Sequence, residues 1–155
     1  MEIILANPKH LEEVAMLFDK YRIFYNQSSD IEAARNFLQE RFQANDSKIF
    51  MARQDDCGIG FTQLYPSFSS VSMKRIWILN DLFVEESHRH QGVAKLLIGI
   101  AEKYATETGA IRIVLATQTS NIAAQTLYES SGYIKDHDFY HYKISIENPG
   151  LLEHV

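Results

Sequence analysis

The sequence predicts an α/β fold with a mixed, mostly antiparallel sheet of about seven strands and about four helices. Three observations lead to this prediction. Short runs of strand-forming residues are interspersed with longer segments whose apolar residues recur at helical spacing. The strands on either side of the helix expected over residues 92–104 should be parallel, because a crossover helix returns the chain in the same direction. The length of 155 residues suits one domain, residues 1–155, with a core of its own.

The first half of the chain predicts a strand, two helices and three strands. "EIILA" is the first strand, and Asn7 and Pro8 suit the cap and the first position of a helix. In the next helix, "SSDIEAARNFLQERF", Ser29 and Glu32 are predicted to form a capping box. Three further strands are expected in "KIFMAR", "IGFTQLY" and "KRIWILNDLFV".

The second half predicts a helix, a strand, a shorter helix and a closing hairpin. The helix over residues 92–104 has one apolar face, and Gly109 lies near its end, as a C-terminal cap would. "IRIVLAT" has the continuous apolar character of a buried strand. A short helix follows in "NIAAQTLYESS", and "YIKDH" with "FYHYKISI" predicts the hairpin.

Composition excludes several classes of function. The net charge of −5 disfavours nucleic acid as a partner, because a nucleic-acid-binding protein usually carries a basic face. No apolar stretch approaches the roughly 20 residues that cross a bilayer, so we expect no membrane partner. The N-terminus has no basic start and no cleavage site of a signal peptide. The single cysteine, Cys57, fits a reducing compartment, and we expect a cytoplasmic protein.

The stretch "LFVEESHRHQGVAKLLI", residues 82–98, carries the clearest functional pattern. The first N–H groups of a helix have no partner within the helix, and together with the helix dipole they attract anions. Gly92 lets a phosphate approach the backbone, and Arg89 and His90 add positive charge. On these residues alone, an ordinary strand-to-helix loop with solvated side chains remains the alternative. The spacing matches neither the phosphate loop of nucleotide triphosphatases nor the dinucleotide fingerprint.

Two segments resemble the GNAT superfamily of N-acetyltransferases. "RHQGVA", residues 89–94, matches its acetyl-CoA signature R/Q-x-x-G-x-G/A, and "TSNIAAQTLYESSGY" matches its second segment at the expected distance. The resemblance is best from about residue 59 to 146, and within the superfamily it points to small-amine, polyamine and histone-acetyltransferase-like members. It implies the GNAT fold, with acetyl-CoA as the co-substrate and no metal.

The resemblance also implies where acetyl-CoA lies. It would lie between splayed parallel strands that end at Val84 and Ala116, with the pantetheine arm along the first strand and the pyrophosphate on the following turn. The expected cofactor-binding residues are Leu82, Phe83, Val84, Arg89, His90, Gln91, Gly92, Val93, Ala94, Lys95, Asn121 and Ala124. Tyr128 occupies the position of the proton donor to the leaving thiolate, and the backbone N–H near Val84 is the expected oxyanion donor.

Asp81 interrupts the otherwise apolar strand "RIWILNDLFV". Strict alternation places it with Trp77, Leu79 and Phe83, and a buried carboxylate must find a cation, hydrogen-bond donors or water. A bulge or kink at Asn80–Asp81 is the structural alternative. The segment resembles polyamine acetyltransferases, which carry an acidic pair here; the first member of the pair is Asn80 in this chain, which leaves the general base open. We expect Asp81 to act as a catalytic or substrate-anchoring residue.

Aromatic residues are candidates for the acceptor site. Tyr65 and Phe68 are expected to enclose an amine through cation–π contacts, with core or dimer packing as the alternative. Tyr21 and Tyr25 are candidates of the same kind. The histidines lack supporting cysteines or carboxylates, so no metal site is expected.

We therefore expect an N-acetyltransferase that moves an acetyl group to a primary amine of a small polyamine-like or lysine-like acceptor, by direct attack in a ternary complex. Acetylation of protein amino groups and a non-catalytic CoA sensor are the alternatives. The family analogy suggests a homodimer.

Overall fold

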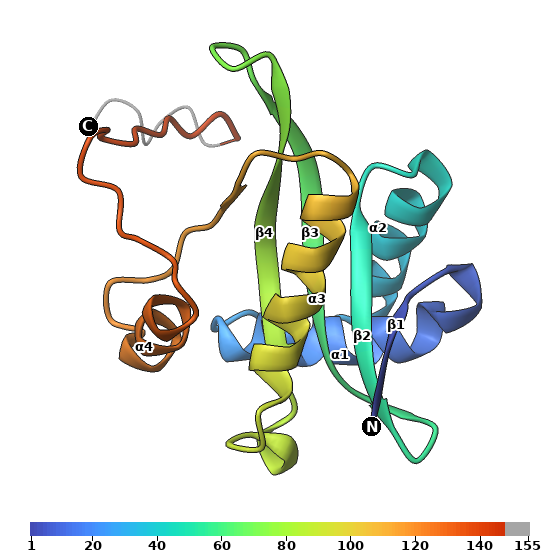
Figure 1. Cartoon of the computed structure of the whole chain (residues 1–155). Coiled ribbons are helices and arrows are strands. Elements are labelled where there is room, and N and C mark those ends of the chain that lie inside the picture. Colours follow the sequence, from blue (N-terminus) through green and yellow to red (C-terminus); the bar gives the residue numbers. More distant parts are fainter. Residues whose placement is uncertain (148–155) are drawn as a thin grey trace. The chain divides into compact units, whose positions relative to one another are not determined.

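The computed structural model describes residues 1–147, which divide into two compact units, residues 1–118 and residues from 119 onward. The first unit contains a sheet of five strands in the order of the sequence (Figure 1). The strands are β1 (Glu2–Leu5), β2 (Lys48–Gln54), β3 (Cys57–Ser69), β4 (Lys74–Val84) and β5 (Ile113–Val114). All neighbours are antiparallel except β4 and β5, which are parallel. The prediction of a mixed, mostly antiparallel sheet is confirmed, with five strands in place of about seven.

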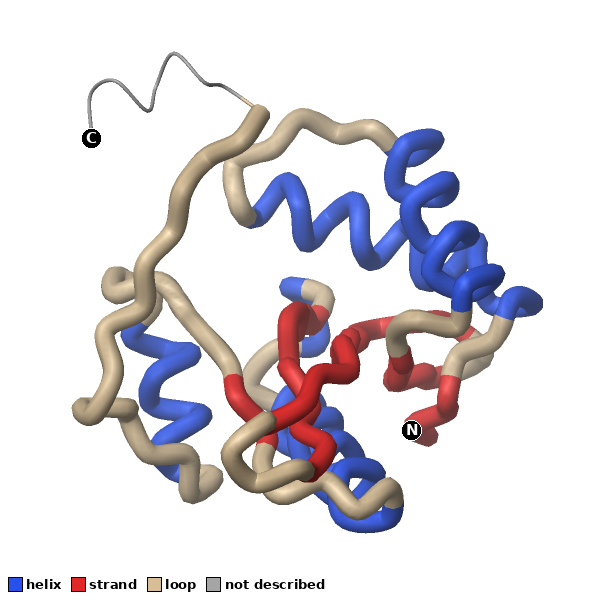
Figure 2. Tube along the Cα trace, turned by 90° about the horizontal axis from the view of Figure 1, so that it is seen from above, coloured by secondary structure: helices blue, strands red, loops and turns tan. Residues whose placement is uncertain are grey.

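Helices cover both faces of this sheet. The elements are η1 (Pro8–His10), α1 (Leu11–Phe24), α2 (Ile31–Ala44), η2 (Glu86–His88) and α3 (Val93–Glu107). Viewed from above, α1 and α2 lie on one side of the strands and α3 lies on the other (Figure 2). We call these two sides of the sheet the α1 face and the α3 face.

The main core lies on the α1 face. Val14 and Leu38 from the two helices pack with Met51 and Phe61 from the sheet, and all four are buried. On the α3 face, Tyr104 packs edge-on against Phe50 and tilted against Trp77, with ring centroids 5.4 Å away in both pairs. The strands alternate between the two faces because successive side chains of a strand point in opposite directions.

The helix starts follow the sequence with one correction. Asn7 accepts a hydrogen bond from the N–H of Lys9, and its own N–H donates to the ring of His10. The second helix is capped by Asp30, which accepts from the N–H of Ala33, so the predicted capping box of Ser29 and Glu32 is wrong. Ser29 instead donates its hydroxyl hydrogen to Asp19, which holds the α1–α2 connection.

The predicted strand over residues 111–117 is much shorter in the structure. Only Trp77–Ile113 and Ile78–Val114 are paired, and the side chain of Val114 is exposed. The continuous apolar composition of residues 111–117 is typical of a buried strand. Within the described residues, however, β5 is the edge strand of the sheet and has one neighbour, β4. Because pairing stops at Ile78, the last six residues of β4 leave β5, as the expectation of diverging strands requires.

The second unit contains α4 (Ile122–Ser130), which confirms the short helix. Asn121 caps it by accepting a hydrogen bond from the N–H of Ala124. The predicted closing hairpin is wrong for the described residues, since residues 133–147 form no strand. Most of the aromatic and branched side chains that suggested strands are exposed here and have no sheet neighbour: Ile134, Phe139, Tyr140, Tyr142, Ile144 and Ile146.

Candidate active site

A bulge in β4 organises the polar residues on the α1 face. Gln63 of β3 pairs with Asp81, and the next residue, Leu64, pairs with Leu79, so that Asn80 is an extra residue. Thr62, which is fully buried, donates its hydroxyl hydrogen to the carbonyl oxygen of Asp81 at 2.8 Å. The bulge that the sequence left as an alternative at Asn80–Asp81 is therefore present.

The bulge corrects the predicted orientation of Asp81. Trp77 packs against Tyr104 on the α3 face, whereas Phe83 packs against Tyr21 of α1. Strict alternation would place these two rings on one face, but the inserted residue reverses the sides. Asp81 consequently shares the α1 face with Phe83 and not with Trp77 and Leu79.

The Asp81 carboxylate is buried and has no cationic partner. Its side chain is 5% exposed. One oxygen, Oδ2, accepts a hydrogen bond from Gln63 Nε2 at 2.8 Å, and the other, Oδ1, accepts from Asn80 Nδ2 at 3.1 Å. Within residues 1–147 no lysine, arginine or histidine forms an ion pair with it. A buried carboxylate with amide donors alone attracts a cationic group.

The pKa of Tyr65 is affected by the negative charge of Asp81. Burial, the largest cause, and the negative charge of Asp81 together raise the pKa of the Tyr65 phenol to about 12, against the opposing effect of Arg41. The phenol therefore stays protonated at neutral pH and keeps an O–H donor on the α1 face. The predicted acceptor-site residue Tyr65 thus lies in the same environment as Asp81.

Aromatic rings of α1 line the same face. The Tyr21 ring stands edge-on to Phe61 at 5.7 Å and to Phe83 at 6.3 Å between centroids. Tyr25 stands edge-on to Tyr21 at 5.0 Å. Tyr21 thus packs against the part of β4 that follows Asp81, and Tyr25 packs against Tyr21; the sequence singled out both tyrosines only by residue type. Aromatic faces near a carboxylate suit an organic cation.

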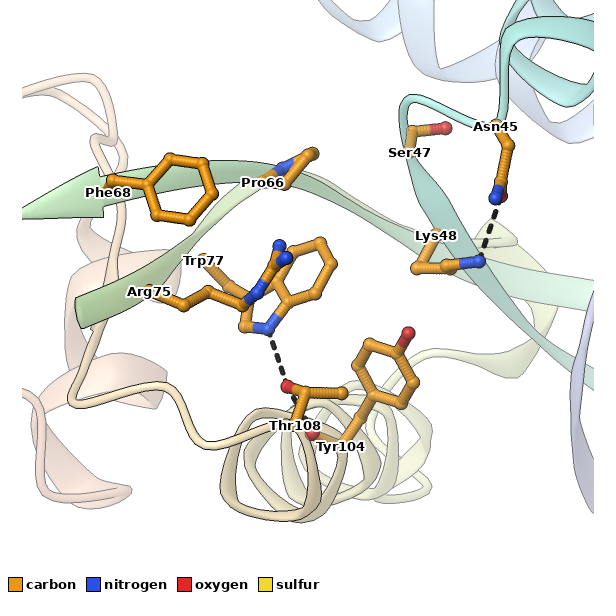
Figure 3. Close-up of a pocket in the computed structure, with 9 residues that line it drawn as sticks. All are labelled: Asn45, Ser47, Lys48, Pro66, Phe68, Arg75, Trp77, Tyr104 and Thr108. Carbon is orange, nitrogen blue, oxygen red and sulfur yellow. Dashed lines mark hydrogen bonds between the residues drawn. The ribbon is translucent and has the colours of Figure 1, made fainter.

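Phe68 does not belong to this group. It lies with Trp77 and Tyr104 around a hollow of about 510 Å³ on the α3 face, where Arg75 stacks between Phe68 and Trp77 (Figure 3). Tyr65 and Phe68 are three residues apart in one strand and therefore point to opposite faces. The expectation that these two rings enclose one amine is wrong.

The turn between β4 and α3 has the form of an anion cradle. His90 and Gly92 adopt left-handed backbone angles, with φ of 63° and 81°. The amides of Val93, Ala94 and Lys95 have no hydrogen-bond partner within the described chain, and the first backbone bond of α3 runs from Leu96 to Gly92. A Cβ built on Gly92 would meet nothing within 4 Å, so the space in front of these amides is open.

Two charged side chains beside the turn make contacts that the sequence analysis did not anticipate. Arg89 folds back onto β4, where its Nε donates to the carbonyl oxygen of Val84 at 2.9 Å and its guanidinium lies over the rings of Phe24 and Phe83. Lys20 of α1 forms an ion pair with Glu85. No local pattern predicts the contact of Arg89 with Phe24 or the ion pair of Lys20 with Glu85, because Phe24 and Lys20 lie in α1, far from the turn in the sequence.

Gln63 is the residue that the sequence analysis missed. Like Asp81, it interrupts an apolar strand, "IGFTQLY", and this interruption was the available signal.

Among residues 1–147 no three His, Cys, Asp or Glu side chains are grouped to hold a metal ion, and no helix there is long and apolar enough to cross a membrane.

In the second unit, Tyr128 of α4 is buried and packs at a tilt against Tyr133, with ring centroids 5.7 Å apart. Asn121 and Ala124 form the start of this helix. The two residues that the sequence assigned to cofactor binding here thus hold the N-terminal turn of α4 in shape.

Comparisons with known proteins agree with the fold. The family model described as the acetyltransferase (GNAT) family matches residues 13–133. The chain is 44% identical over 146 residues to the uncharacterized N-acetyltransferase YhfO of Bacillus subtilis, covering 94% of this chain and 98% of that protein. It also resembles a crystal structure of a probable acetyltransferase, with a TM-score of 0.90, 45% identity and coverage of 94% of this chain and 98% of the other.

A more distant structure shares the fold. It is the aminoglycoside acetyltransferase AAC(6')-Iy in complex with the bisubstrate analogue CoA-S-monomethyl-acetylneamine, at 24% identity and a TM-score of 0.78, covering 94% of this chain and 98% of that one. The family match spans most of the chain and includes both the anion cradle and α4. The chain belongs to the GNAT family and is an N-acetyltransferase of that family.

Proposed function

We propose that this acetyltransferase moves an acetyl group from acetyl-CoA to a primary amino group of a small, cationic acceptor. The observation that carries the proposal is the Asp81 carboxylate, which is buried on the α1 face with amide donors but without a cation. A carboxylate in this state stabilises a positive charge that the acceptor brings.

Acetyl-CoA is assigned to the end of β4 and the following turn. The backbone of Leu82, Phe83 and Val84 would pair with the pantetheine arm, because β5 no longer pairs with this part of β4. The pyrophosphate would lie on the free amides of the anion cradle. The proposed phosphate-binding residues are Arg89, His90, Gln91, Gly92, Val93, Ala94 and Lys95. In the second unit, Asn121 and Ala124 are assigned to the cofactor by the family motif.

The chemistry needs no covalent enzyme intermediate. The neutral amine attacks the thioester carbonyl carbon, the carbon–sulfur bond breaks, and the thiolate leaves with a proton. We assign that proton to the Tyr128 hydroxyl and the oxyanion contact to the N–H near Val84. Asn80 stands at the bulge where a polyamine acetyltransferase carries an acid, so the proton of the amine is assigned to water.

The charge at Asp81 decides which amino group of the acceptor it holds. A carboxylate favours the protonated form of an amine, and a protonated amine cannot attack a thioester. Asp81 therefore suits a second amino group that does not react, and the acceptor is a diamine or a related molecule with two cationic centres. Tyr65, Tyr21 and Tyr25 would flank that group.

Thiol release from acetyl-CoA across monoamines, diamines, aminoglycosides and lysine peptides tests the proposal. Diamines should be turned over best, and Asp81→Asn should raise their KM more than it raises the KM of monoamines. An ion pair near a protein surface contributes ~1–4 kcal/mol, and each 1.4 kcal/mol is about tenfold in KM. Asp19→Asn is the matched control, since Asp19 is also buried but accepts from Ser29 and Asp30.

Three other outcomes would each replace the proposal. A fall in kcat for every amine in Asp81→Asn would make Asp81 the general base. Turnover of peptides alone would indicate a protein substrate. Tight CoA binding without any turnover would indicate a sensor.

A homodimer and a cytoplasmic location are further proposals. The homodimer rests on family analogy and is tested by light scattering, and the location rests on the single, exposed Cys57.

A further inference from the structure

Gln63 has a buried hydrogen-bond acceptor that no described residue satisfies. Its side chain is fully buried, and within the described chain its Oε1 has no hydrogen-bond partner. The other end of the same amide, Nε2, donates to Asp81 Oδ2 at 2.8 Å. The orientation of the amide is fixed by chemistry, because the reversed amide would place Oε1 against a carboxylate oxygen.

A buried acceptor without a donor is costly, at about 1–3 kcal/mol, so its presence points to a donor from outside the chain. The Asp81 carboxylate also lacks a partner for its charge, because the described residues give it two amide hydrogens but no cation. The two acceptors come from paired positions of β3 and β4 on one face of the sheet. One ligand group that carries several N–H donors and a positive charge would satisfy both.

We propose that Gln63 Oε1 and the Asp81 carboxylate together bind a primary ammonium group of the acceptor, and that Gln63 selects it against N-methylated amines. This inference rests on the proposed function for the identity of the reaction. A primary ammonium has three N–H donors, enough for Asp81, Gln63 and one further acceptor. A dimethylammonium has the same charge but one N–H, which Asp81 takes, so that Gln63 Oε1 stays unsatisfied.

The negative potential at this place agrees with the inference. Burial and the charge of Asp81 raise the pKa of Tyr65 to about 12, and among residues 1–147 no cationic side chain forms an ion pair with Asp81. Charge alone, however, attracts methylated and unmethylated ammonium groups equally. The discrimination comes from the number of N–H donors on the ammonium group, because Gln63 Oε1 needs a second N–H in addition to the one that Asp81 accepts.

The test compares three acceptors of equal chain length whose distal group is NH₃⁺, NH(CH₃)₂⁺ or N(CH₃)₃⁺. In the wild type, kcat/KM should be roughly 10- to 100-fold higher for the primary ammonium than for the dimethylated one, the range for one hydrogen bond to a charged group. In Gln63→Met, which keeps the length of the side chain, this ratio should fall to a few-fold. Gln63→Glu, which keeps an acceptor oxygen, should retain the preference.

Asn80→Ala is the matched control. Asn80 and Gln63 each donate one hydrogen bond to Asp81, but only Gln63 presents a free acceptor. Asn80 is exposed, so its removal leaves the core intact. Asn80→Ala should keep the preference for the primary ammonium. Equal loss of preference in Asn80→Ala and Gln63→Met would mean that Gln63 only orients Asp81, and would overturn the inference.

Binding measurements separate this inference from the proposed function. The same three amines are titrated by calorimetry into the wild type in the presence of CoA, where no reaction occurs. Absence of thiol release would sink the proposed function, yet a primary-ammonium preference in binding would still support Gln63. Equal affinity of the wild type for all three amines, or no affinity for any, would show that a water molecule satisfies Oε1 and would overturn the inference.

Discussion

Gly60 of β3 lies where a side chain would push β4 out of place. It pairs with Val84, and a Cβ built on it would be 2.8 Å from the carbonyl oxygen of Phe83 and 3.4 Å from the Val84 Cα. Real Cβ contacts essentially never fall below 3.0 Å, and the atom that would have to move is backbone. We therefore expect Gly60→Ala to displace the end of β4, which is the strand assigned to the pantetheine arm.

The size of the effect follows from overpacking. Forcing a methyl group into a packed site costs ~1–3 kcal/mol in the free energy of unfolding. For a chain of this length, ~1 kcal/mol lowers Tm by about 2–4 °C, so Gly60→Ala should melt roughly 2–12 °C lower than the wild type. The affinity for CoA should fall as well, because the carbonyl of Phe83 and the backbone of Val84 change position.

Gly58→Ala provides the control in the same strand. Its Cβ would meet Met51 Sδ at 2.9 Å and Leu17 Cδ1 at 3.1 Å, both on flexible side chains that can adjust. Both substitutions remove the same backbone freedom from the unfolded chain, so this contribution cancels between them. Differential scanning calorimetry and CoA titration of the two variants test the reasoning. Equal Tm and equal CoA affinity in both variants would refute it.

Three further predictions concern the cofactor turn, the proton donor and the acceptor site. Gly92→Ala and Gly109→Ala both place a Cβ at positive φ with nothing within 4 Å, so both should lose similar stability, but only Gly92→Ala should weaken CoA binding; equal calorimetric affinity would contradict the anion cradle. Tyr128→Phe should lower kcat by ~10²–10⁴-fold with nearly unchanged acetyl-CoA affinity, and wild-type turnover would assign the proton to water. Asp81→Asn should lower the pKa of Tyr65 from about 12, because a negative charge that favours the protonated phenol is removed; ultraviolet titration, with Tyr65→Phe identifying the signal and circular dichroism monitoring the fold, checks this, and an unchanged pKa would contradict the proximity.

Local patterns in the sequence were sufficient for the order of the elements as far as α4 and for the backbone geometry of the anion cradle. Asn7 caps η1, the 3-10 turn directly before α1, and α3 ends next to Gly109; both features depend on residues within one turn and agree with the sequence patterns. The cradle depends on one glycine at positive φ directly before a helix, which is also a local property. The family motif lies in the same short stretch, so it could be identified without knowledge of the tertiary structure.

Segments that depend on distant partners were predicted less well. The run over residues 111–117 has the composition of a central strand, yet two residues pair, because a strand exists only where a neighbour supplies its hydrogen bonds. The apolar stretch after residue 133 shows the same limit, since its described residues have no strand partner. In both places the residues favour a β-strand, but the structure provides few or no strand neighbours to pair with them.

The tertiary structure decided which residues make up the proposed acceptor site. The sequence by itself determined that β4 carries one carboxylate, Asp81, among apolar residues, and that an anion-binding turn follows it. The bulge at Asn80 decided which face this carboxylate occupies, and a shift of one residue in register moves every later side chain to the other side of the sheet. That shift separated Asp81 from Trp77 and Phe68, brought it to Tyr65, and opposed it to Gln63 of another strand. Register between strands is set by hydrogen bonds and packing across the sheet, which no periodicity within a single strand records.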